Sequence, residues 1–159
     1  MKQDIINLKK AVDDGIAGNS IWLPIGFNKM GSSVGIGQKI YTIVGGMSGT
    51  GKTAFTDLAY VLQPYQWFKE HGEEHNLEVN WIYFSMERSK QYKQAKWAGI
   101  RTLISIPYLM SVPAILGWGS RKNHIPGEIY DKLVESLDAL DPVLDYVDIV
   151  EGSVNPTGV

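Results

Sequence analysis

The feature that most constrains this chain is the octapeptide Gly46–Thr53, GMSGTGKT, which directly follows the apolar run 40–44 and Gly45. It fits the pattern G-x-x-x-x-G-K-S/T, which is typical of loops that wrap phosphate groups. Such a loop turns its backbone N–H groups inward, and glycine allows the positive φ values and the close approach that this needs. With an apolar strand predicted before it and a helix after it, the octapeptide predicts a nucleoside triphosphate site.

Each residue type in this loop has an expected role. Lys52 would place its ammonium on the outer phosphates, and the Thr53 hydroxyl would bind Mg²⁺. The helix that begins there points the positive end of its dipole at the anion. The residues predicted to bind the nucleotide are Gly46, Ser48, Gly49, Thr50, Gly51, Lys52 and Thr53. The alternative is a glycine turn that binds nothing.

Composition limits the class of protein. A chain of 159 residues with 44% hydrophobic content can form one globular domain with a sizeable core. A net charge of −2 gives no general attraction to nucleic acid. The absence of cysteine excludes disulfides and thiolate metal sites, and the three histidines are scattered. With no long apolar run and no signal-like N-terminus, we expect a cytoplasmic, intracellular protein with no membrane contact.

The rest of the chain alternates between predicted strands and helices. Strands are expected at 40–44, 79–85 and 146–150, with helices between them, which predicts an α/β fold with a parallel sheet and right-handed crossovers. Pro64 is expected to kink or end the helix that follows the loop. The last residues carry helix-start signals with no helix behind them, so the chain is expected to be the N-terminal piece of a longer protein.

Residues 1–20 form a separate predicted segment. The apolar residues Ile5, Leu8, Val12 and Ile16 recur at helical spacing with charged residues between them, which predicts an amphipathic helix. Two interpretations stay open. The helix packs on its own domain, or it is a linker that docks on a neighbouring subunit.

Glu87 is the second candidate residue. It follows the predicted strand 79–85, and ligands of open α/β sheets lie beyond the carboxyl ends of the strands. There Glu87 could polarise a water molecule as a general base, while the alternative is a surface glutamate in a turn. Ser89 is expected to cap the next helix, whose lysines and arginine we interpret as solvated surface with no assigned ligand.

Several motifs of the chain resemble the RecA-like ATPase core of DnaB-type replicative helicases, which include phage-encoded members. The similarity covers residues 21–159 and rests on 24–27 (PIGF), 35–40 (GIGQKI), 46–55 (GMSGTGKTAF) and 84–87 (FSME). Arg88 departs from the methionine that often follows the glutamate in this family. The segment 64–78 is also longer than a compact crossover needs.

This resemblance implies a P-loop NTPase with a RecA-like sheet, of which 21–159 is the N-terminal part, ending before the Walker B strand. It implies binding of ATP and Mg²⁺, with Lys52 and Glu87 as catalytic residues. In the complete protein it implies ATP hydrolysis, a hexameric ring, and single-stranded DNA bound through regions beyond Val159. The piece alone would be almost inactive.

Other functions stay open. One is another RecA-like motor or switch, such as a recombinase or a clock-type ATPase. Another, from a different class, is a structural or cargo protein that keeps a nucleotide pocket without turnover. A small-molecule phosphotransferase is less favoured, because such enzymes usually clamp phosphates with several arginines and this chain has only Arg88, Arg101 and Arg121.

Overall fold

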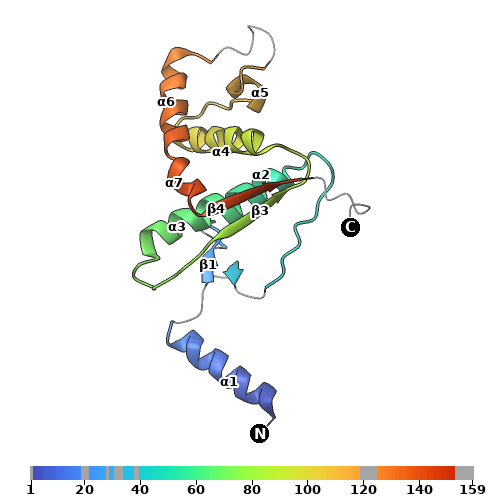
Figure 1. Ribbon diagram of the computed structural model, residues 1–159, viewed down its shortest axis with the longest axis vertical. Coiled ribbons are helices and arrows are strands. Elements are labelled where there is room, and N and C mark those ends of the chain that lie inside the picture. Colours follow the sequence, from blue (N-terminus) through green and yellow to red (C-terminus); the bar gives the residue numbers. More distant parts are fainter. Residues whose placement is uncertain are drawn as a thin grey trace. The chain divides into compact units, whose positions relative to one another are not determined.

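The computed structural model describes residues 2–18, 22–27, 29–30, 34–37, 40–118 and 125–152. The chain forms two compact units, Met1–Glu78 and Val79–Val159. The division expected at residue 20 remains a prediction, and each unit is described here by itself. Together they contain helices and two small sheets, so the protein is mixed α/β (Figure 1).

The first unit opens with the helix α1, Gln3–Ile16, which confirms the helix predicted from the apolar spacing. None of its residues is buried, and Ile16 is 82% exposed. Packing of α1 on its own domain, one of the two interpretations, is therefore not seen among the described residues. Docking on a neighbouring subunit remains a prediction.

A short hairpin and a long helical segment form the core of the first unit. Strand β1, Trp22–Pro24, pairs antiparallel with β2, Gly35–Gly37. Gly35 has no room for a side chain, since a Cβ there would lie 2.6 Å from the Leu23 carbonyl oxygen. The helix α3, Gln63–His71, packs on β1 and buries Tyr65 and Phe68, while the hairpin side buries Leu23 and Ile25.

The helical segment that follows the loop continues through Pro64. It consists of α2, Lys52–Asp57, a π-helical stretch η1, Leu58–Leu62, and α3. Proline lacks an N–H donor and collides with the carbonyl four residues earlier in an α-helix. Here the π-helical stretch η1 precedes Pro64, and the Gln63 N–H donates to the Leu58 carbonyl five residues back. The helix therefore changes register before Pro64, and the expectation that Pro64 could end it is wrong.

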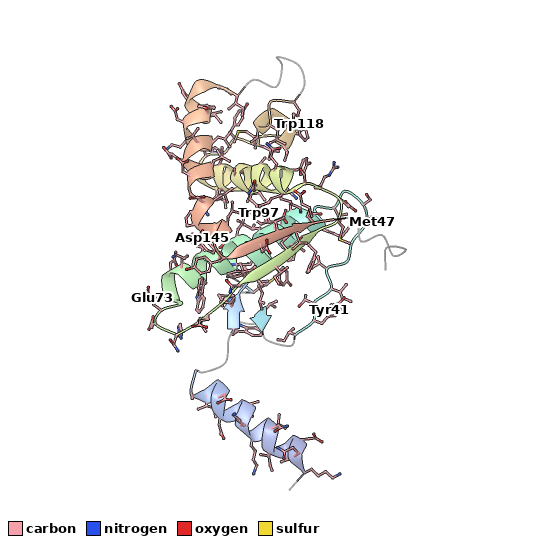
Figure 2. The ribbon with its side chains drawn as sticks, viewed as in Figure 1. Tyr41, Met47, Glu73, Trp97, Trp118 and Asp145 are labelled. Atoms are coloured by element: carbon pink, nitrogen blue, oxygen red, sulfur yellow. The ribbon has the colours of Figure 1, made fainter. Side chains whose placement is uncertain are left out.

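The strand predicted at 40–44 is not formed, and that expectation is wrong. Residues 40–47 adopt neither helix nor strand, and Tyr41 and Ile43 are 89% and 78% exposed. Tyr41 and Met47 both belong to this irregular run (Figure 2). An apolar run becomes a strand only when a neighbour accepts its backbone hydrogen bonds, and no described strand pairs with this one.

The second unit is built on two parallel strands, as predicted for two of the three segments. Strand β3, Trp81–Ser85, pairs with β4, Val147–Glu151, in a register that runs from Trp81↔Val147 to Ser85↔Glu151. The sheet of this unit has these two strands among the described residues, so the three-stranded parallel sheet of the prediction is not found. One face remains open, with Ile82 and Phe84 each 65% exposed.

Between the two strands, the described residues form the helices α4, Lys90–Ser105, α5, Val112–Ile115, α6, Gly127–Asp138, and α7, Asp141–Leu144. Helix α4 contacts both α5 and α6 (Figure 1). Its Ser89 cap is as predicted, since the Ser89 hydroxyl accepts a hydrogen bond from the Tyr92 N–H. Trp97 of α4 is fully buried and meets the Tyr83 ring of β3 edge-on, with 5.7 Å between ring centroids.

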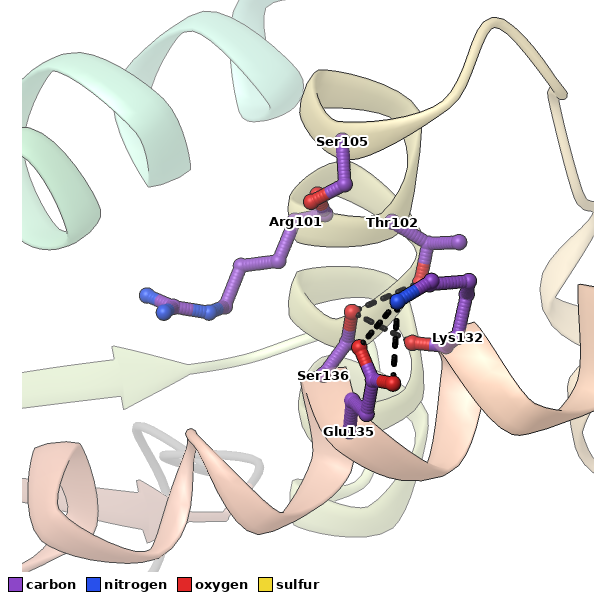
Figure 3. A network of polar contacts seen from close by, with 6 residues as sticks. All are labelled: Arg101, Thr102, Ser105, Lys132, Glu135 and Ser136. Carbon is purple, nitrogen blue, oxygen red and sulfur yellow. Dashed lines mark hydrogen bonds and ion pairs between the residues drawn. The ribbon is translucent and has the colours of Figure 1, made fainter.

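Two hydroxyl groups link α4 to α6 (Figure 3). Thr102 Oγ1 lies 3.0 Å from Ser136 Oγ and 2.9 Å from the Ala98 carbonyl oxygen. Ser136 Oγ donates to the Lys132 carbonyl at 2.9 Å. Because both side chains are buried, this contact satisfies polar groups that water cannot reach.

Candidate nucleotide site

The loop Gly46–Thr53 forms a tight turn that runs into the first two residues of α2. Gly49 and Gly51 have φ values of +79° and +84°, in the left-handed region that glycine adopts without strain. Gly46 is needed for a different reason, because a Cβ there would lie 2.9 Å from Thr50 Oγ1. The three glycines therefore fix the path of this turn, as the sequence pattern predicts.

Polar groups of the loop hold the Lys52 side chain within it. Its Nζ donates to the carbonyl oxygens of Gly46 and Met47 at 2.8 and 2.7 Å. The Thr50 hydroxyl also donates to the Met47 carbonyl, at 2.8 Å. The ammonium therefore already lies against the turn. Charged oxygens of a bound anion could take the place of its two neutral carbonyl acceptors.

The remaining loop residues are open to solvent. Ser48, Gly49 and Thr53 are exposed, and no atom lies within 4 Å of a Cβ built at Gly49 or Gly51. The first N–H groups of the helix have no acceptor four residues back within the helix, so they are available to an anion. The Thr53 hydroxyl is an oxygen ligand of the kind that Mg²⁺ prefers. The donor set fits a magnesium-bound phosphate chain.

Two aromatic residues connect the loop helix to the hairpin. Phe27 and Phe55 stack with 5.6 Å between ring centroids and 4° between ring planes. Phe27 follows Gly26, which has a φ of +74°, and a Cβ on Gly26 would lie 2.5 Å from the Gln63 Cβ. The segment 24–27, which carried part of the family resemblance, therefore packs against the same helical segment that begins at the loop.

Glu87 lies in the other unit, in the turn that follows β3. Its side chain is exposed, and the turn is closed by the Ser85 hydroxyl, which donates to the Arg88 carbonyl at 2.5 Å. The Glu151 carboxylate at the end of β4 accepts a hydrogen bond from the Lys90 N–H. Both contacts hold the turn that presents Glu87 beyond the carboxyl end of β3, at the position that the sequence predicted.

Three further observations bear on the site. Among the described residues, no three histidine, aspartate or glutamate side chains gather into a group that could hold a metal ion. None of the helices in the described ranges is both long and apolar enough to cross a membrane. Comparison of the chain with models of protein families, with curated proteins and with solved structures finds no match.

The sequence did not predict the aromatic contacts near the nucleotide loop or those near Glu87. Phe27 and Phe55 are far apart in the chain, and so are Tyr92 and Trp118, whose ring centroids lie 6.4 Å apart. Arg88 lies over the Tyr92 ring at 4.9 Å from its centroid. Arg88 precedes the Ser89 cap of α4, so helical spacing gave no signal for its contact with Tyr92.

Proposed function

We propose that this chain is the ATP-binding part of a P-loop ATPase, and that the complete protein is a DnaB-like replicative helicase. The observation that carries the proposal is the Gly46–Thr53 turn, with Lys52 Nζ held by two loop carbonyls at the start of α2. A helicase is the more specific part of the proposal and rests on the family resemblance of the sequence motifs. The hexameric ring and single-stranded DNA belong to that part.

In the proposed site each loop residue has a defined task. Lys52 exchanges the Gly46 and Met47 carbonyls for phosphate oxygens, and it neutralises charge on the outer phosphates. The N–H groups of residues 49–52 donate to the same oxygens, and that of Thr50 exchanges the Met47 carbonyl for them. Thr53 holds Mg²⁺, and when bound this ion would stabilise the charge that develops on the phosphates.

Glu87 is proposed as the general base. A carboxylate at the end of a strand can accept a proton from water and so orient the attack on the γ-phosphate. Support for this role comes from the turn, in which the Ser85 hydroxyl holds the Arg88 carbonyl and the Glu151 carboxylate holds the Lys90 N–H, just after Glu87. The exposed position of Glu87 leaves it accessible to a water molecule and a ligand.

A titration of MgATP tests the nucleotide site directly. We expect the chain to bind MgATP, and Lys52→Ala to weaken binding about 10- to 100-fold, because charge-assisted hydrogen bonds contribute about 1.5–3 kcal/mol. Lys69→Ala is the matched control, since it removes an exposed lysine from α3 and should leave the affinity unchanged. Equal affinity in the wild type and Lys52→Ala would remove Lys52 from the site.

A nucleotide pocket without turnover is the competing function. Both functions predict the same MgATP titration, so they differ only in hydrolysis by the full-length natural protein. Release of phosphate that depends on Glu87 supports the ATPase. Tight binding with no phosphate release, also in the presence of single-stranded DNA, supports a structural or cargo role.

A further inference from the structure

Phe55 is an aromatic side chain beside the phosphate loop to which the proposed site gives no task. Phe27 stacks on its ring, with 5.6 Å between centroids and 4° between ring planes. Tyr60 meets the same ring edge-on, with a centroid distance of 6.2 Å and an angle of 66°. We call these three residues the Phe27–Phe55–Tyr60 group. All of them belong to the first unit, as the loop does.

The geometry of α2 places Phe55 close to the loop. Phe55 follows Lys52 by three residues, which is about 4.5 Å along a helix axis. Its N–H donates to the Gly51 carbonyl at 2.9 Å, in the first turn of the helix. A side chain on a helix leans toward the N-terminus and covers the turn before its own Cα. The ring of Phe55 is therefore carried on the turn of α2 that adjoins the expected phosphate position.

The aromatic group leaves part of Phe55 uncovered. An aromatic ring has two faces and an edge, of which Phe27 covers one face and Tyr60 contacts the edge. Phe55 remains 36% exposed. The loop beside it is open as well, because no atom lies within 4 Å of a Cβ built at Gly49 or Gly51. A flat group attached to a phosphate chain in the loop would find aromatic surface within reach.

A phenyl ring recognises a base by its face and not by its edge. Phenylalanine has no hydrogen-bond donor or acceptor in its side chain, so Phe55 and Phe27 cannot distinguish an amino group from a carbonyl on a base. Every base has a π-face, and stacking on an aromatic ring is therefore tolerant of base identity. The larger ring system of a purine offers more stacking area than a pyrimidine does.

We infer that Phe55 stacks on the base of the nucleotide whose phosphates the loop binds, with Phe27 extending the stack on its far side. The inference rests on the proposed nucleotide site and names its substrate class. Because the base is held by stacking and not by hydrogen bonds to its edge, the site takes purine nucleoside triphosphates with adenine or guanine alike.

Three ligands separate the base from the phosphates. MgATP and MgGTP carry both parts, whereas magnesium tripolyphosphate carries the phosphate chain alone. Isothermal titration of the wild type should show similar affinities for the two nucleotides, and both should bind more tightly than tripolyphosphate. A preference above about tenfold for one purine would indicate hydrogen bonds to the base edge and would overturn recognition by stacking alone.

Replacing Phe55 tests the stacking contact. We expect Phe55→Ala to weaken the binding of both nucleotides about tenfold, in the range of one lost stacking contact, and to leave tripolyphosphate binding unchanged. Phe55→Tyr should restore most of the nucleotide affinity, since it keeps the ring. Retained tripolyphosphate binding also shows that the loop of the variant is folded. Equal loss for all three ligands, or no loss for any, would overturn the role of Phe55.

A second aromatic residue of the same unit serves as the control. Trp67 lies on α3 and stacks on His71, with 5.0 Å between ring centroids, so Trp67→Ala should leave all three affinities unchanged. Failure of the nucleotide site has a different result from failure of this inference. If the wild type bound neither MgATP nor tripolyphosphate, both would be overturned. Tripolyphosphate binding with no effect of Phe55→Ala on the nucleotides would overturn this inference alone.

Discussion

Replacing Thr102 by valine removes a hydrogen bond between α4 and α6 and leaves the other polar groups paired. A hydroxyl has one proton, so Ser136 Oγ, which donates to the Lys132 carbonyl, acts as the acceptor for Thr102, and the one Thr102 proton is shared between Ser136 Oγ and the Ala98 carbonyl. In Thr102→Val the Ser136 hydroxyl keeps its Lys132 acceptor. We therefore expect the free energy of unfolding to fall by about 1 kcal/mol, the net contribution of one hydrogen bond, without an added penalty for a buried unpaired group.

The double variant makes the argument quantitative. Ser136→Ala should also lower the free energy of unfolding by about 1 kcal/mol. The contact between the two hydroxyls is lost only once, so the double variant should be destabilised by well below the sum of the two single losses. Urea unfolding of the wild type, both single variants and the double variant gives a coupling of about 0.5–1 kcal/mol. Ser105→Ala is the control, since its exposed hydroxyl only donates to the Arg101 carbonyl at 3.2 Å. A coupling below about 0.3 kcal/mol would refute the contact shown in Figure 3.

Three further predictions concern the candidate base, a helix cap and a glycine. Glu87→Gln in the full-length natural protein should retain MgATP binding but lower turnover about 10²-fold, as phosphate release would measure, and wild-type turnover would exclude Glu87 as the base. Ser89→Ala should destabilise the second unit by about 1 kcal/mol in urea unfolding, because it removes the cap of α4, and no change would show that the cap does not stabilise it. Gly26→Ala should cost at least about 1–2 kcal/mol, since its φ is +74° and a Cβ would collide with Gln63, and thermal unfolding at the wild-type temperature would contradict that packing.

Helices were the most predictable part of the fold. The spacing of Ile5, Leu8 and Val12 is a property of the helix itself, and α1 forms where that spacing places it. The caps also depend on local chemistry, so Ser89 could be assigned from sequence alone. The π-helical turn before Pro64 could not, because proline indicates only that the regular pattern must change and not how.

Strands depended on distant partners and were predicted less well. Residues 81–85 and 147–151 pair in parallel, whereas the equally apolar run 40–44 has no strand partner in the described part of the chain. The loop was predictable because Gly49, Gly51 and Lys52 determine its geometry within a few residues. The contact between Tyr92 and Trp118 was not predictable, since it depends on how α5 folds back on α4.

The backbone of β3 has a consequence for amide hydrogen exchange. The Trp81 N–H donates to the Tyr146 carbonyl, so in a parallel pair the alternate N–H groups of Ile82 and Phe84 point to the outer edge of the strand. Amides that lack a backbone acceptor exchange with deuterium quickly. A pattern of slow and fast exchange along these five residues would show a strand with one bare edge. Uniform protection would instead reveal that another strand adds to it.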